Sequence, residues 1–215
     1  TLISRKAGDK KSNGTKWVSK GKGEYSIEKI DVENYGTSIT LDLKKSESEF
    51  LDDYRIRGIV SKYSDHITVP ILMNKVSDKE DVIEYETINK ATAFWTQDKK
   101  QLSQQDYDEF YKSLTYDFEG PLTQIHNKLE GKLDYISLLF IPKKAPFDMW
   151  EPKRKGGVKL YAKRVFIMEG NEDLLPQYLR FIKGVIDTAD LSLNVSREIL
   201  QGNKVVDTIR KASVK

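Results

Sequence analysis

The apolar run YISLLFI at residues 135–141 constrains the fold of this chain more than any other stretch. It is far shorter than the ~20 apolar residues that a membrane span needs, and it has the length of a buried strand. A second β-rich segment, VKLYAKRVFIM at 158–168, follows a turn-rich connection. We expect the two segments to pair, and the helical patterns around them predict an α/β sandwich.

Three helical patterns lie around these strands. The first begins at Ser103-x-x-Asp106, a capping box in which serine and aspartate side chains each bind a backbone N–H. A second helix is expected over 174–186, because Asp173 can cap it and Pro176 fits its first turn. A third is expected after residue 204. Their apolar positions are Tyr107, Phe110, Tyr111 and Leu114; Leu174, Leu175, Tyr178, Leu179, Ile182, Val185 and Ile186; and Val205, Val206 and Ile209.

Antiparallel strands are predicted for the start of the chain. WVSKGKGEYSI is typical of a hairpin, and its Gly21 and Gly23 favour a turn over a phosphate loop because no helix signal follows them. GTSITLDLK alternates in period 2, which predicts that its apolar members face inward. These members are Ile39, Leu41 and Leu43.

One helix is predicted between residues 46 and 63. Ser46-x-x-Glu49 has the spacing of a capping box, and an apolar stripe follows at helical spacing. HITVPILM then predicts a short edge strand, because Pro70 cannot donate to a sheet ladder. The stripe consists of Ile56, Ile59, Val60 and Tyr63.

These patterns predict an α/β (α+β) protein with two domains. Residues 1–73 form the first domain, the polar and acidic residues 74–88 form a charged linker, and residues 89–215 form the second domain. The chain does not begin with methionine, so we expect it to be cut from a longer protein.

Composition excludes several kinds of active site. The 215 residues include no cysteine, which rules out disulfides and thiolate metal sites, and only two histidines, His66 and His126. No P-loop or Ser/His/Asp set can be assembled. Asp52 and Asp53 are interpreted as solvated surface next to Arg55. A self-contained hydrolase is therefore not expected.

Local charge leaves a nucleic-acid alternative open. Residues 1–22 carry seven lysines and arginines against Asp9 alone, and Lys153, Arg154 and Lys155 form a second cluster. A basic nucleic-acid-binding module would lose affinity steeply with salt. A non-enzymatic adaptor that docks partners through the second domain is the other alternative.

A resemblance to a known family rests on segments that occur in the family's order: WVSKGKGEYSI, EFLDDYRIRGIVSKYSDHITVPI, IPKKAPFDMW, KLYAKRVFIM and LLPQYLRFIKGVIDTADLSLNVSREILQ. Together they resemble the bacterial branch of the ninety-kilodalton heat-shock chaperone family. The resemblance implies an incomplete Bergerat-type ATPase domain followed by the α/β sandwich of a middle domain. It also implies a cytoplasmic, homodimeric, ATP-dependent stress chaperone that uses ATP and Mg, remodels partly folded clients, and works with co-chaperones rather than nucleic acid or membrane.

The resemblance also implies the site residues. In the family, the arginine of the NVSREILQ loop reaches the γ-phosphate of ATP, and here it matches Arg197, with Gln201 one turn further on. A planar, permanently charged guanidinium suits a transition state that spreads negative charge over phosphoryl oxygens. Thr37 matches a threonine that lines the adenine end of the pocket. The family's catalytic glutamate, its magnesium-binding asparagine and the aspartate that reads adenine match no residue here, so this chain alone is expected to be inactive.

Contacts to clients or to the other domain are expected at apolar residues without obvious burial. The candidates are Trp150 and Phe147 in the turn-rich connection, and Phe166 and Leu193 near the arginine loop. Each is also compatible with ordinary core packing, because strand aromatics are usually buried. One face of the first domain's sheet is expected to be uncovered, since the part of the family fold that packs there is absent.

Overall fold

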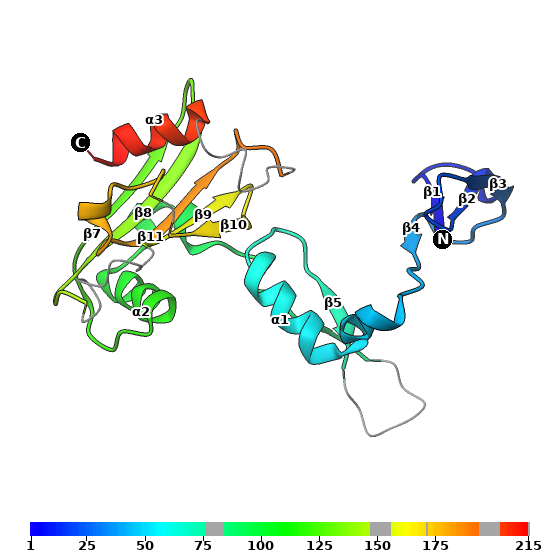
Figure 1. Cartoon of the computed structure of the whole chain (residues 1–215), viewed down its shortest axis with the longest axis horizontal. Helices are drawn as coiled ribbons and strands as arrows, with labels where there is room; N and C mark the ends of the chain where they lie inside the picture. Colours follow the sequence, from blue (N-terminus) through cyan, green and yellow to red (C-terminus); the bar gives the residue numbers. More distant parts are fainter. Residues whose placement is uncertain (76–83, 147–155, 171, 194–202, 215) are drawn as a thin grey trace. The chain divides into compact units, whose positions relative to one another are not determined.

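The computed structural model describes residues 1–75, 84–146, 156–170, 172–193 and 203–214. These residues form an α+β protein with two units, Thr1–Asp53 and Tyr54–Lys215, each with its own sheet (Figure 1). The division falls inside the predicted first domain, 1–73. The family domain boundaries therefore remain a prediction about the longer protein.

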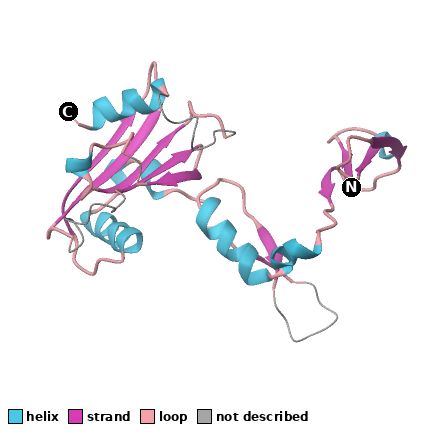
Figure 2. Ribbon diagram, in the orientation of Figure 1, coloured by secondary structure: helices cyan, strands magenta, loops and turns pink. Residues whose placement is uncertain are grey.

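The first unit is built on a four-stranded antiparallel sheet of order β3-β2-β1-β4 (Figure 2). The expected hairpin is confirmed, because β2 and β3 pair along their whole length. Gly21 and Gly23 lie in its turn at φ +71° and +88°, which residues with a side chain rarely adopt. The elements are β1 (Leu2–Arg5), a 3-10 turn (Lys11–Asn13), β2 (Gly14–Ser19), β3 (Tyr25–Ile30), β4 (Gly36–Ile39) and a second 3-10 segment (Lys45–Leu51).

One face of this sheet carries an apolar row that the described residues of the first unit leave partly exposed. The cross-strand register places Ile39 beside Leu2, Leu2 beside Trp17, and Trp17 beside Ile27. Ile39 is 64% exposed and Ile27 61%. The expected uncovered face is thus present. The expectation that Ile39, Leu41 and Leu43 face inward is wrong, because all three side chains are exposed.

The predicted capping box at Ser46 is also wrong. Lys44 is the N-cap of the 3-10 segment, and its side chain makes no capping hydrogen bond. Ser46 lies inside the segment, and its hydroxyl donates to the Glu47 carboxylate. The helix itself is confirmed as α1 (Asp53–Tyr63), which begins later than expected. Its apolar stripe is half-buried at Ile56, Ile59 and Val60.

A two-stranded ribbon occupies part of the predicted linker. β5 (Leu72–Asn74) pairs antiparallel with β6 (Tyr85–Thr87), and the Lys75 N–H donates to the Glu84 carbonyl at 2.7 Å. Residues 74–88 are therefore not irregular throughout, because the β-favouring Tyr85 and Thr87 find a partner strand in the HITVPILM segment. Residues 76–83 lie outside the described part.

The second unit is a five-stranded mixed sheet of order β10-β9-β11-β8-β7. β11 runs parallel to β9 and antiparallel to β8, and the remaining neighbours are antiparallel. The elements are two 3-10 turns (Phe94–Thr96 and Lys99–Gln101), α2 (Gln104–Thr115), β7 (Pro121–Leu129), β8 (Tyr135–Pro142), β9 (Gly157–Ala162), β10 (Val165–Glu169), a 3-10 turn (Gln177–Leu179), β11 (Lys183–Thr188) and α3 (Lys204–Ser213).

Helices cover both faces of this sheet, as the sandwich prediction requires (Figure 1). Alternate residues of β8 enter different cores: Leu138 and Phe140 pack with Tyr107 and Tyr111 of α2. Leu139 packs on the opposite side, in the cluster that contains the buried Val206 and Ile209 of α3. The α2 capping box is confirmed, with the Ser103 hydroxyl on the Asp106 N–H and the Asp106 carboxylate on the Ser103 N–H.

The helix predicted over 174–186 is wrong. Only Gln177–Leu179 is helical, as a 3-10 turn, and β11 follows it. Gly184 has φ +149°, and a Cβ there would lie 2.2 Å from the Leu138 carbonyl oxygen, so β11 packs closely against β8. Its β-branched residues then alternate between the two cores. The predicted direct pairing of segments 135–141 and 158–168 is also wrong, because β11 lies between them in the sheet.

Burial lowers the pKa of both histidines. The ring of His126 lies between the Trp95 carbonyl oxygen, 2.8 Å from Nε2, and the Tyr107 hydroxyl, 2.9 Å from Nδ1. His66 has its Nδ1 2.9 Å from the Thr92 carbonyl oxygen, and desolvation is again the main cause of its lowered pKa. Neutral imidazoles are therefore favoured in the folded state.

We expect the stability of the chain to fall as the pH drops from about 7 to about 5. The unfolded histidines take up protons near pH 6.5, whereas the folded ones resist protonation to lower pH, so acid favours the unfolded state in this window. Thermal unfolding followed by circular dichroism measures this slope. The double variant His66→Asn/His126→Gln should flatten it, and an unchanged slope would contradict the assignment. Asp106, whose pKa is lowered by its hydrogen bonds to Ser103, acts only at more acidic pH.

Candidate functional site

The predicted nucleotide-binding residue Thr37 lies on the edge strand β4 of the first unit. Its side chain is exposed and its Oγ1 is 2.8 Å from the hydroxyl of Ser4 on β1. The register continues this polar row through Thr15 to Lys29, whose Nζ is 3.3 Å from the Thr15 hydroxyl. Polar groups therefore lie next to the exposed apolar row on the same face of the sheet.

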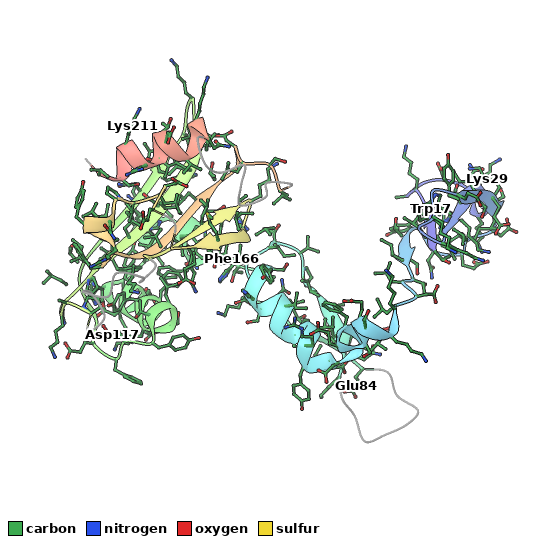
Figure 3. All side chains as sticks on the ribbon, viewed as in Figure 1. Trp17, Lys29, Glu84, Asp117, Phe166 and Lys211 are labelled. Atoms are coloured by element: carbon green, nitrogen blue, oxygen red, sulfur yellow. The ribbon has the colours of Figure 1, made fainter. Side chains whose placement is uncertain are left out.

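The predicted contact residues Phe166 and Leu193 belong to the second unit. Phe166, on β10, is half-buried, with its ring 5.9 Å from that of Tyr63 and 5.7 Å from that of Tyr161 (Figure 3). Leu193 is 51% exposed at the end of a described segment. Phe166 is thus available for contact on only part of its surface, whereas Leu193 is open.

Four further predicted residues lie outside the described part of the chain. These are Arg197 and Gln201 of the NVSREILQ loop and Trp150 of the turn-rich connection, together with Phe147. Their assigned roles remain predictions from the resemblance.

The centre of the second unit is an indole that the sequence did not single out. Trp95 is 1% exposed, and its Nε1–H donates to Oδ2 of Asp187 at 2.9 Å. Its ring lies 4.7 Å from that of His66 and 4.8 Å from that of Tyr161. Trp95 therefore fixes the segment after α1 to the sheet. Burial raises the pKa of Tyr161, so this hydroxyl stays neutral.

The side chain of Asn89 also binds the segment after α1. Its buried Oδ1 accepts from the Ile71 N–H at 2.8 Å, and its Nδ2 donates to the carbonyl oxygens of Val69 and Ser64. A single amide side chain, just after β6, thus binds the turn after α1 and the residues that lead into β5.

The loop after α2 displays two aromatic side chains to solvent. Tyr116 is 87% exposed and Phe118 is 92% exposed, and Leu122 beside them is also exposed. Between them, the Asp117 carboxylate accepts from the Tyr111 hydroxyl at 3.0 Å and from the Glu119 N–H at 3.0 Å. This hydrogen bond and burial, the larger cause, raise the pKa of Tyr111 to about 12.

The aromatic loop, defined as residues 116–122, is therefore ordered while its apolar side chains lack cover. Glu119 also pairs with Lys144, which ties the loop to the chain after β8. Tyr116 itself has φ +58°, an uncommon conformation for an aromatic residue. Exposed apolar patches mark protein interaction sites, which makes this loop a candidate. The sequence signal was the pair of aromatics around an aspartate at a helix end.

Other candidates for chemistry are less developed. Among the described residues, no three His, Asp or Glu side chains are grouped to hold a metal ion. In the basic start of the chain, Lys11 pairs with Glu33, and Lys16 with Glu28 at 2.8 Å. No helix of the described ranges is long and apolar enough to cross a membrane.

Comparison with known proteins defines the class. Residues 73–215 match the family model described as Hsp90 protein, and this chain belongs to the Hsp90 family. The chain is 75% identical to the chaperone protein HtpG of Ruthia magnifica subsp. Calyptogena magnifica over 99% of its own length. It is 57% identical to HtpG of Hydrogenovibrio crunogenus and 52% identical to HtpG of Escherichia coli K12, each over 100% of this chain. It spans 35% of the length of each of these relatives.

We expect Asp187→Ala to destabilise the second unit by about 1–3 kcal/mol, because it leaves the buried Trp95 N–H without an acceptor. Urea unfolding followed by fluorescence measures the change. Asp190→Ala is the matched control: Asp190 accepts from the Asp134 N–H at an exposed position, where water can replace it. Equal losses in the two variants would mean that Trp95 does not depend on this bond.

Proposed function

We propose that this chain is part of an ATP-dependent molecular chaperone that binds and remodels partly folded proteins. The observation that carries the proposal is the aromatic loop, where Tyr116 and Phe118 are ordered and almost fully exposed. A soluble domain gains nothing in stability from exposing two aromatic rings, whereas a protein that binds unfolded chains needs apolar side chains that remain accessible. Membership of the Hsp90 family and the chaperone names of the relatives support the same function.

The first unit is proposed to be the end of a Bergerat-type nucleotide-binding domain. Its uncovered apolar row, Ile39, Leu2, Trp17 and Ile27, fits a sheet face on which further helices pack. Thr37 stands in the polar row beside it and would line the adenine end of the pocket. ATP and Mg would be bound mainly by residues that precede this chain in the longer protein.

The second unit is proposed to complete the ATPase site. Arg197 would stabilise the γ-phosphate in the transition state, with Gln201 close by, and Leu193 and Phe166 would contact the nucleotide-binding domain or clients. A guanidinium supplied by a second domain makes hydrolysis depend on domain closure. The longer protein is proposed to act as a cytoplasmic homodimer with possible co-chaperone partners, while this chain alone lacks the groups needed for turnover.

Replacement of the exposed rings should weaken client binding. In the longer protein, Tyr116→Ser/Phe118→Ser is expected to reduce the affinity for a labelled, permanently unfolded protein by about tenfold or more, as for aromatic hot spots. Fluorescence anisotropy measures the affinity, and circular dichroism verifies the fold.

The matched control for this experiment is Tyr54→Ser, because Tyr54 is 84% exposed but lies on α1. The Tyr54→Ser variant should bind the unfolded protein with the affinity of the parent protein. If both variants bind clients as tightly as the parent protein, the aromatic loop is not the binding surface.

Arg197→Ala in the longer protein should leave ATP binding nearly intact, because the other domain holds adenine and ribose. Hydrolysis should slow by about 10³–10⁵-fold, or by less where domain closure limits the rate. Binding by calorimetry and single-turnover hydrolysis must be measured separately. Arg210→Ala on α3 serves as the control, and full activity of the Arg197 variant at saturating ATP would refute the assigned role.

A further inference from the structure

The turn between β9 and β10 has an unusual conformation for its sequence. Ala162 pairs with Val165, so the turn consists of Lys163 and Arg164 alone. Both have positive φ, at 49° and 68°. Two-residue hairpin turns of this kind favour Asn-Gly, since a side chain at positive φ is strained. Here the turn carries two long cationic side chains instead.

Contacts to the end of β11 hold this turn in place. The Arg164 N–H donates to Oδ1 of Asp187 at 3.1 Å, and the Lys163 N–H donates to the Thr188 carbonyl oxygen at 3.1 Å. Asp187 is buried and is itself fixed by Trp95 through its other oxygen. Strain that surrounding structure maintains in this way is characteristic of functional positions.

An open pocket lies at this end of the sheet. Lys163 and Arg164 line it together with Thr96, Leu129 and Ile136. Its carboxylates already have partners within the chain: Asp187 accepts the two hydrogen bonds above, Asp134 accepts from the Gly131 N–H, and Glu130 pairs with Lys128. Within the described ranges, neither the Lys163 ammonium nor the Arg164 guanidinium forms an ion pair with a carboxylate, so both side-chain groups are available to a ligand in this pocket.

The chemistry of the pocket favours a carboxylate over a phosphate. Phosphate sites usually offer free backbone N–H groups, and both N–H groups of this turn are already donated within the fold. A guanidinium forms two parallel hydrogen bonds with a carboxylate. Leu129 is 40% exposed beside the turn, and Ile136 is half-buried, so apolar groups next to the carboxylate also find contacts.

We propose that the Lys163–Arg164 turn binds an Asp or Glu side chain of a partner polypeptide, with the apolar neighbours of that residue against Leu129 and Ile136. The site consists of residues other than those of the aromatic loop. It does not depend on the ATPase cycle proposed above.

The test is a titration of the full 215-residue chain, labelled with ¹⁵N, with the peptide acetyl-Leu-Glu-Leu-Glu-Leu-amide. Chemical shifts of the Lys163 and Arg164 N–H groups should move and saturate. The matching glutamine peptide should bind at least about tenfold more weakly, because it lacks the charge that doubles the strength of these hydrogen bonds. Equal affinity for both peptides would overturn the proposal, as would inorganic phosphate moving the same signals at lower concentration.

Two variants separate recognition from folding. R164Q should weaken binding of the glutamate peptide at least about tenfold without changing the fold. K163N/R164G installs the preferred turn residues, so it should abolish binding while raising Tm by a few degrees through relief of strain. K132Q, in the neighbouring β7–β8 hairpin, should change neither quantity. Parental affinity in R164Q, or a lowered Tm in K163N/R164G, would refute the inference.

Discussion

The buried indole of Trp95 is the contact on which the second unit depends. The indole N–H donates to Asp187, the ring lies against His66 and Tyr161, and the backbone carbonyl oxygen of the same residue binds His126. These partners come from β11, the turn after α1, β9 and β7. One residue therefore joins the segment that leaves α1 to three strands of the sheet, and Asp187 also binds the strained turn of Lys163 and Arg164.

Elements set by local interactions could be predicted from the sequence. The capping box of Ser103 and the β2–β3 hairpin need only residues close in the chain, and both are present. The segment 174–186 was misjudged because an apolar run of this density fits a helix and a buried strand equally well. The close approach of Gly184 to the backbone of β8 favours the strand, and this contact exists only in the packed sheet. Ser46 has the right spacing for a cap, but the chain turns too tightly there for an α-helix to begin.

The candidate site also combines residues that the sequence could indicate with contacts that only the folded chain reveals. Trp95 and Asp187 are 92 residues apart, so no sequence pattern links them. The Tyr111–Asp117 hydrogen bond joins the aromatic loop to α2 and forms only once α2 has folded, so the sequence pattern of the loop does not show it. Thr37, Arg197 and Gln201 were named through the family resemblance, since threonine in a strand or arginine in a loop has no distinctive chemistry alone. Of these, Thr37 is described, and it lies beside Ser4 in a polar row that its own strand could not reveal.

The β5–β6 ribbon has a consequence for how the chain tolerates change. Because Asn74 pairs with Tyr85 and Lys75 with Glu84, the two ends of the intervening segment are held next to each other by backbone hydrogen bonds. The entropy cost of joining two fixed ends grows only logarithmically with the length of the chain between them, by about 0.6 kcal/mol for each doubling. Insertions between these fixed ends would therefore cost little and would leave the pairing of β5 with β6 unchanged.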